Sequence, residues 1–224
     1  SASTQSAAPD ATAWRRADFD DNAWLSGPAT FWYGDVFEGT QITDMQNSYV
    51  TLFFRQKFNV TNPGDLESLV LHAQCDDGFI VWLNGTEILR YNVPDGDLPY
   101  TATALTAENP DPATFKDYAI ANPKAVLKAG VNQLAVQVFN VNPGSSDIIW
   151  DASLVGAFDL AVPVVANLQP PSGATVRELT SIEVEFSESV AGVDAGDLLV
   201  NGVAATNVLA VSGSQYVFTF PKPA

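Results

Sequence analysis

Phe79-Ile-Val-Trp-Leu-Asn-Gly-Thr-Glu-Ile-Leu-Arg90 carries the clearest folding signal in this chain. Two apolar runs flank Asn84-Gly85, a dipeptide typical of β-hairpin turns because both of its residues readily adopt positive φ. Each run is short and rich in residues that favour strands. The sequence therefore predicts an antiparallel hairpin over residues 79–90.

The chain on both sides of this hairpin follows a two-residue period. One parity of a predicted strand is apolar and the other is mostly polar, which is typical of a half-buried antiparallel strand. The apolar set is Val50, Leu52, Phe54, Phe58 and Val60, and the polar set is Thr51, Arg55 and Lys57. Further strands of this kind are expected at 69–73, 134–138 and 148–154. Helical periodicity is nearly absent, so we predict an all-β fold. The proline-rich excursion 92–123 is expected to be a long loop with one or two short strands, and such loops are often functional.

Composition excludes several classes of partner. The net charge is −16, from 10 basic and 26 acidic residues, so phosphate backbones and anionic lipids should repel the chain. We therefore predict no nucleic-acid partner, and the lack of a long apolar run predicts no membrane insertion. Cys75 is the single cysteine, so no internal disulfide can form, and its apolar neighbours indicate a core residue.

The distribution of prolines and polar residues divides the chain. We expect a flexible N-terminal segment at 1–12, a β-sandwich at 13–160, a linker at 161–170 and a second module at 171–224. Asn201-Gly202 predicts a second hairpin turn in the last module. We read the sequence as part of a longer protein that is secreted or displayed at a cell surface.

Four motifs follow one another over residues 13–158. They are Trp14-Arg-Arg-Ala-Asp-Phe-Asp-Asp-Asn-Ala-Trp24 with Phe31-Trp-Tyr-Gly34, Phe53-Phe-Arg-Gln-Lys-Phe58, Asp76-Asp-Gly-Phe-Ile-Val-Trp-Leu-Asn-Gly85 and Gly130-Val-Asn-Gln-Leu-Ala-Val136. This order resembles galactose-binding-like domains, which occur as sugar-binding domains and carbohydrate-binding modules of bacterial glycosidases. The resemblance implies a jelly-roll β-sandwich, an extracellular setting and, in some members, a structural Ca²⁺ ion.

The last module resembles a different family. Pro171-Ser-Gly-Ala-Thr-Val176 and the segment 190–202 are similar to bacterial immunoglobulin-like repeats of large surface or secreted proteins. A complete sandwich of that type needs roughly 100 residues, so we expect a truncated immunoglobulin-like β-sandwich here.

Motifs for catalysis are lacking. His72 is the single histidine, and its place in a strand pattern indicates a structural role. The chain has no Gly-x-Ser-x-Gly elbow, phosphate loop or Cys/His zinc spacing. With 26 acidic residues, some pair would meet the glycosidase spacing by chance. We therefore expect no enzymatic activity.

Aromatic loop residues are the first candidates for ligand binding, because a sugar ring can stack on an exposed aromatic face. Trp32 and Tyr33 form a dense cluster, and Tyr91 and Tyr100 lie near the start of the proline-rich excursion. These residues would form one platform if their loops meet at one end of the sandwich. The alternative is that Trp32 and Tyr33 close the base of the sandwich.

Charged residues supply the remaining candidates. Asp76 and Asp77 bind Ca²⁺ or sugar hydroxyls in one interpretation, and in the other they accept backbone amides in a tight turn. Arg90 binds a sugar acid or pairs with a local carboxylate.

A structural Ca²⁺ ion would need oxygen ligands. Asp147 and Asp151 share one side of the last strand of the sandwich, and we predict that they meet Asp20, which is also expected to cap a short turn.

These observations lead to one functional prediction and one alternative. The prediction is a non-catalytic carbohydrate-binding or adhesion module of a secreted bacterial multidomain protein, with a polysaccharide or glycan and further domains of the same polypeptide as partners. The alternative is a structural spacer or protein-interaction module within a larger surface protein or polysaccharide-degrading enzyme.

Overall fold

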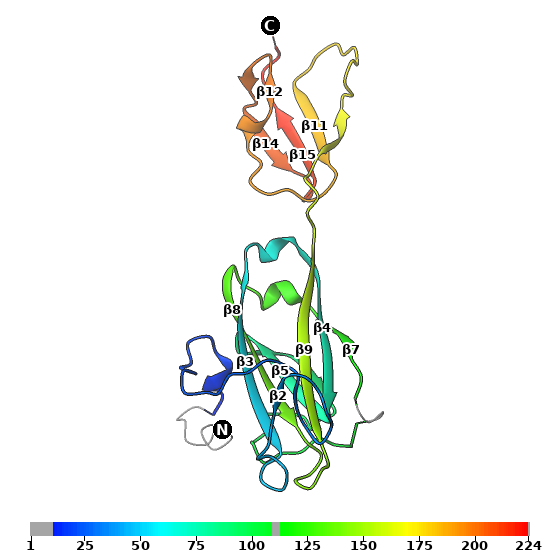
Figure 1. Ribbon diagram of the computed structural model, residues 1–224. Coiled ribbons are helices and arrows are strands. Elements are labelled where there is room, and N and C mark those ends of the chain that lie inside the picture. The colour runs from blue at the N-terminus through cyan, green and yellow to red at the C-terminus, as the bar shows by residue number, and fades with distance from the viewer. Residues whose placement is uncertain (1–10, 109–112, 224) are drawn as a thin grey trace. The chain divides into compact units, whose positions relative to one another are not determined.

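The computed structural model of the chain describes residues 11–108 and 113–223 (Figure 1). All but the last two residues of the predicted N-terminal segment 1–12 therefore lie outside the described part. Strands make up 42% of the structure, and no helix within the described residues reaches seven residues, which confirms the predicted all-β sandwich class. The described residues contain no helix long and apolar enough to cross a membrane. Contacts divide the chain into two units, Ser1–Asp159 and Leu160–Ala224.

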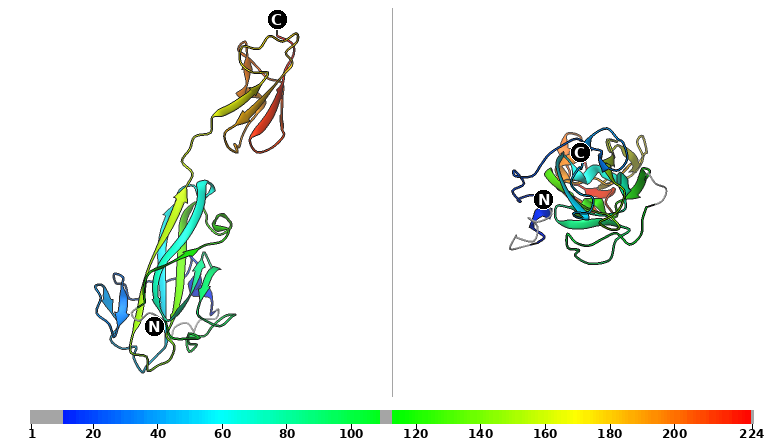
Figure 2. Two further views of the ribbon diagram at one scale, coloured as in Figure 1. Left: turned by 90° about the vertical axis from the view of Figure 1, so that its right-hand side faces the viewer. Right: turned by 60° about the horizontal axis from the view of Figure 1, so that its bottom comes forward.

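The first unit consists of two facing sheets. The five-stranded sheet has the order β2-β1-β9-β4-β7 and comprises β1 (Phe31–Tyr33), β2 (Thr40–Gln41), β4 (Leu66–Asp76), β7 (Lys116–Ala119) and β9 (Ile148–Phe158). The four-stranded sheet has the order β3-β8-β5-β6 and comprises β3 (Thr51–Val60), β5 (Gly78–Leu83), β6 (Thr86–Tyr91) and β8 (Gly130–Phe139). Figure 2 shows from a second side how the long strands of this unit lie alongside one another. Short 3₁₀ turns occur at η2 (Ala13–Arg15), η3 (Pro63–Asp65) and η4 (Pro123–Ala125).

The predicted hairpin is confirmed as β5 and β6. Asn84 has φ 53° and Gly85 has φ 89°, so both turn residues have the positive φ that the sequence requires. The Asn84 side chain strengthens the turn by accepting the backbone N–H of Gln133 at 3.0 Å and donating to the carbonyl of Val126 at 2.8 Å. The hairpin is thus fastened to β8 and to the segment that precedes it.

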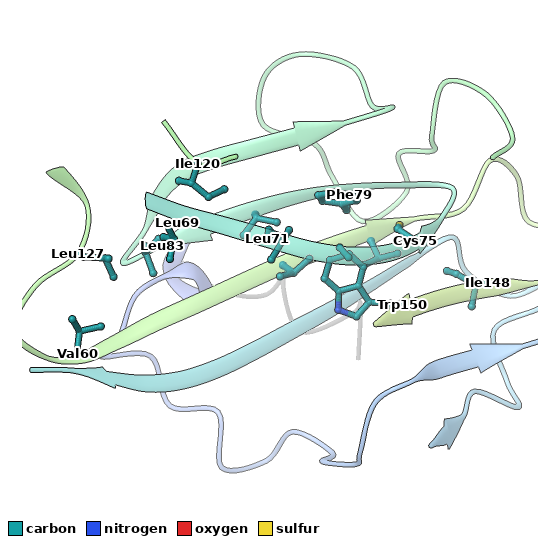
Figure 3. Packing of buried hydrophobic residues seen from close by; sticks show 14 of the residues in the cluster. Val60, Leu69, Leu71, Cys75, Phe79, Leu83, Ile120, Leu127, Ile148 and Trp150 are labelled. Carbon is teal, nitrogen blue, oxygen red and sulfur yellow. The ribbon is translucent and has the colours of Figure 1, made fainter. Parts of the chain in front are cut away.

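The main core lies between the two sheets. The inward residues of the alternating strands meet there, and Figure 3 shows Leu71, Phe79 and Trp150 among them. Cys75 is part of this core, where desolvation raises the pKa of its thiol well above the ordinary value. This agrees with the predicted role of a small apolar core residue.

A second core covers the outer face of the four-stranded sheet. Trp14, from η2, packs edge-to-face on Phe53 at 4.9 Å and on Trp82 at 5.4 Å between ring centroids. Leu98 and Ala104, which follow β6, pack into the same cluster. This sheet is therefore buried on both faces.

Arg55 attaches the segment 16–21 to the four-stranded sheet. Its guanidinium donates to Asp21 Oδ2 at 2.6 Å, to the carbonyl of Arg16 at 3.0 Å and to Gln133 Oε1 at 2.9 Å. Only 2% of its side chain is exposed. The hydrogen bond from Arg55 lowers the pKa of the Asp21 carboxyl, and the paired carboxylate makes the segment's attachment charge-assisted.

The second unit has its own sheet and core. Its four-stranded sheet has the order β10-β11-β15-β14 and comprises β10 (Val165–Gln169), β11 (Ser181–Phe186), β14 (Asn207–Ala210) and β15 (Gln215–Thr219). The turn η5 (Ala195–Asp197) precedes the hairpin of β12 (Leu199–Val200) and β13 (Val203–Ala204). Val184, Tyr216 and Phe218 form the centre of its core. The immunoglobulin-like character of this unit stays a prediction.

Replacing Arg55 by Met should lower the free energy of unfolding by about 3 kcal/mol, because it leaves several part-buried acceptors without a donor. Urea unfolding of the whole chain measures this difference. Lys57→Met is the matched control, since it removes one positive charge from an exposed position of the same strand. Equal effects of the two variants would contradict the anchoring role of Arg55.

The ion pair of Arg55 with Asp21 predicts that the stability of the fold depends on pH. Because the pKa of Asp21 is lower in the folded chain than its ordinary value of 3.8, the ion pair stabilises the fold above that pH. Its contribution disappears as the pH falls through the lowered folded pKa. The stability difference between wild type and Asp21→Asn should therefore be full at about pH 6 and shrink on acidification. A difference that stays constant down to strong acid would contradict this.

Candidate functional site

A pocket of about 370 Å³ opens where β6 ends and β7 begins. It is lined by Tyr91, Asn92, Thr106, Ala107, Glu108 and Lys116. We refer to it as the Tyr91 pocket. Its volume lies near the lower end of the range of small-molecule sites, which is about 300–1,000 Å³.

Two edge strands from opposite sheets form the walls of this pocket. Tyr91 pairs with Phe79 at the edge of the four-stranded sheet, and Lys116 pairs with Ala73 at the edge of the five-stranded sheet. The Tyr91 and Tyr118 rings, one from each sheet, lie 5.5 Å apart between centroids. Tyr91 and Lys116 are thus held on strands, and the other four lining residues lie in the segment that connects β6 to β7.

A charge-assisted network connects the polar groups of the pocket. The Tyr91 hydroxyl donates to Glu108 Oε2 at 2.8 Å. The Lys116 ammonium donates to the Tyr91 hydroxyl at 3.1 Å and to Glu108 Oε1. The hydrogen bond to Glu108 raises the pKa of Lys116 above its ordinary value, so the ammonium stays charged. An ammonium has three donors, and these contacts use two, so one donor can serve a ligand.

Asp77 fixes the backbone of Glu108, which lines the pocket. Its Oδ1 accepts the backbone N–H of Glu108 at 2.7 Å, and its Oδ2 accepts the backbone N–H of Val141 at 2.6 Å. Asn92 donates to the Asp77 carbonyl at 3.0 Å. Asp77 is 2% exposed and accepts backbone amides, as in the alternative drawn from the sequence, but these amides come from distant segments and not from a tight turn. Asp76 is also buried.

The aromatic pair at β1 faces two directions. Tyr33 is 6% exposed, packs in the main core and donates from its hydroxyl to the carbonyl of Ser145 at 3.2 Å. Its burial raises the pKa of its hydroxyl. Trp32 lies between two core-facing residues of the strand, so the pleat directs its ring to the other side of the sheet. Tyr33 therefore closes the base of the sandwich and does not share an exposed platform with Trp32.

Two further predicted ligand residues lie outside the pocket lining. Arg90 forms a bidentate pair with Glu87, at 2.9 Å and 2.7 Å, and also donates to the carbonyl of Gly96 at 2.9 Å. This is the local pairing that the sequence left open. Tyr100 is half-buried in the segment that covers the outer face of the four-stranded sheet, where its carbonyl accepts the Thr51 hydroxyl at 2.7 Å.

The predicted metal ligands each have a separate local partner. Asp20 accepts the backbone N–H of Asn22 at 3.1 Å, as a capping residue would, and Asp151 accepts the Thr30 hydroxyl at 2.9 Å. Asp147 accepts the Ser146 hydroxyl at 3.0 Å. Over residues 11–108 and 113–223, no three His, Cys, Asp or Glu side chains form a group that could hold a metal ion. These three aspartates therefore do not gather, and Ca²⁺ binding stays a prediction.

The sequence identified Tyr91 as a candidate but missed Glu108 and Lys116. Lys116 shares its strand parity with Tyr118 and Ile120, so the alternation could have placed it on the inner side. Glu108 lies in the proline-rich excursion, where the sequence predicts Tyr100 and not Glu108 as a ligand residue. Its partner Asp77 is 31 residues away, a pairing that no local pattern reveals.

Comparison with known proteins gives distant structural likenesses. No family model matches the chain, and no curated protein matches it. A β-glucuronidase from an uncultured Clostridium sp. is similar at 14% identity, over 62% of this chain and 24% of that one, with a TM-score of 0.30. A β-glucuronidase from Ruminococcus gnavus is 12% identical, over 80% and 31%, with a TM-score of 0.30. A β-D-mannosidase from Dictyoglomus thermophilum is 12% identical, over 77% and 23%, also at 0.30.

The chain therefore spans less than a third of the length of each of these three structures. All three are glycosidases by name. Because these TM-scores are low, the fold of this chain is defined by its own strand order and register.

The network predicts a specific pattern of stability. Lys116→Met should destabilise the first unit by about 2 kcal/mol, because the Glu108 carboxylate, whose side chain is 4% exposed, loses its cation. Glu108→Gln in the same chain should recover part of this loss, which denaturant unfolding of the double-mutant cycle measures. Lys124→Met, at an exposed lysine, should change little. Strict additivity of the two pocket variants would contradict the coupling.

Proposed function

We propose that the first unit is a non-catalytic carbohydrate-binding or adhesion module that binds a glycan in the Tyr91 pocket. The observation that carries this proposal is the convergence of a tyrosine hydroxyl, a charged donor and a buried acceptor in one small pocket. The hydroxyls of a sugar need donors and acceptors of this kind. We place the module in a secreted or cell-surface bacterial multidomain protein, beside further domains of the same polypeptide.

The polar groups of the pocket are organised before a ligand arrives. Tyr91, Glu108 and Lys116 already hold one another by hydrogen bonds, and Asp77 fixes the backbone of Glu108. Binding of a ligand whose hydroxyls join this network would cost little conformational entropy of the protein. Lys116 would donate its third N–H to a sugar oxygen, and Glu108 would accept a hydroxyl through a remaining lone pair.

The carboxylates around the pocket favour binding over catalysis. Glycoside hydrolysis needs one carboxyl group to donate a proton and another to act as nucleophile or base. Both oxygens of Asp77 accept backbone amides, and both oxygens of Glu108 are bonded to Lys116 and Tyr91. This arrangement supports a role in holding a ligand.

A second candidate is a structural spacer or protein-interaction module. The observation that favours it is the use of predicted ligand residues for packing and local pairing. Tyr33 is in the core, and Arg90 is saturated by Glu87 and nearby carbonyls. A module that binds no glycan would still need these contacts.

Affinity gel electrophoresis of the whole chain distinguishes the two candidates. Polysaccharides embedded in the gel should retard the wild type, and Tyr91→Phe and Lys116→Met should reduce the affinity about tenfold or more, because each removes a hydrogen-bonding group of the pocket. Lys124→Met and Trp32→Ala serve as controls outside the pocket and should retain binding. Thermal unfolding verifies that all variants are folded.

If a panel of plant, fungal and bacterial polysaccharides leaves the wild type unretarded, the spacer role is favoured. If Trp32→Ala abolishes retardation and Tyr91→Phe does not, the binding site lies on the outer face of the five-stranded sheet.

A further inference from the structure

The lining of the Tyr91 pocket contains the carboxylate of Glu108 and the ammonium of Lys116. The carboxylate of Asp77 accepts the backbone N–H of Glu108 at 2.7 Å. Asp77 and Glu108 are both buried, where the fields of their charges are weakly screened.

Among the described residues that line the pocket, Lys116 is the one cation, and it is already paired with a carboxylate. Lys116 contacts Glu108 directly and also lies 5.2 Å from the centre of the Tyr91 ring. A carboxylate on a ligand would approach Lys116 only by approaching Glu108 as well. Attraction to one group and repulsion from the other would largely cancel, and the desolvation cost of the ligand's charge would remain.

A neutral hydroxyl fits the same place better. It can accept the free N–H of Lys116 and donate its own hydrogen to a Glu108 oxygen, so both partners gain a hydrogen bond. A carboxylate has no hydrogen to donate and would leave two acceptors facing each other.

The size of the pocket limits the ligand further. Tyr91 packs against Phe79 at 5.6 Å, and Phe79 packs against Tyr118 at 5.3 Å between ring centroids. Phe79 is fully buried, so these rings fill the space between the sheets behind the pocket. A volume of about 370 Å³ suits one sugar ring better than the interior of an extended chain.

We infer, building on the glycan-binding role proposed above, that the Tyr91 pocket takes a single uncharged sugar unit and discriminates against sugars that carry a carboxylate. The discriminating group is Glu108, which offers an acceptor where an acidic sugar would need a donor. Lys116 is its counterion and the donor to the sugar oxygen.

Isothermal titration calorimetry of the whole chain tests this inference. The probes are the methyl glycosides of glucose, galactose and mannose, the corresponding uronic acid glycosides, and the methyl esters of those uronic acids. The ester is the matched control, because it keeps the size of the acid and removes its charge. At least one neutral glycoside should bind, and its uronic acid should bind at least tenfold more weakly than the ester of that acid.

Glu108→Gln should narrow the difference between acid and ester, since it removes the opposing charge. Glu87→Gln, which changes a carboxylate paired with Arg90 outside the pocket lining, should leave the difference unchanged. The comparison of acid with ester uses the wild type alone, so it holds even if Glu108→Gln does not fold.

Two failures can be told apart. If an acidic sugar binds as well as its ester or better, and Tyr91→Phe weakens that binding, glycan binding stands and the charge selectivity is wrong. If only oligosaccharides bind and no monosaccharide competes with them, the single-unit inference is wrong. If neither a monosaccharide nor a polysaccharide binds, the proposed function fails together with this inference.

Discussion

A buried carboxylate must be hydrogen-bonded, and Asp77 satisfies this requirement with backbone amides from two distant segments. It stands at the corner between β4 and β5, where the chain passes from one sheet to the other. Its oxygens hold Glu108 on one side and Val141 on the other. The corner, the rim of the Tyr91 pocket and the segment after β8 are therefore fixed by one side chain. Without the Asp77 side chain, the backbone of Glu108 would lose the hydrogen bond that helps to position its carboxylate beside Lys116.

The two sheets of the first unit differ in the number of faces that are buried. The four-stranded sheet has a core on each face, and every residue of β5 is buried. The five-stranded sheet exposes residues of β9 on its outer face, where Ser153 and Val155 reach solvent. Antiparallel sheets commonly have one solvated face, so the doubly covered sheet is the unusual one. Its cover comes from the N-terminal segment and from the start of the proline-rich excursion, and the later part of that excursion supplies Glu108.

Much of the fold could be predicted from the sequence because it depends on local patterns. The Asn84-Gly85 turn and the alternation in β3, β4 and β8 depend on φ preference and on the two faces of a strand. The second core could not be predicted in this way. Trp14 contacts Phe53 and Trp82, far along the chain, and nothing in the local pattern shows which tryptophans meet. The network of Glu108 and Lys116 was missed for the same reason.

The aromatic residues show why the site is smaller than the sequence suggested. An aromatic ring can fill a core or face a ligand, and the same apolar surface drives both. Parity separates these uses within a strand, so Tyr33 lies inward and Trp32 lies outward on β1. Tyr91 combines the two, because its ring packs on the core and its hydroxyl reaches the pocket. Edge strands make this possible: they lie at the margin of the core, where one residue can contact both the interior and solvent. The candidate site at this margin takes Tyr91 and Lys116 from the strands of the sandwich and its other lining residues from the segment between them.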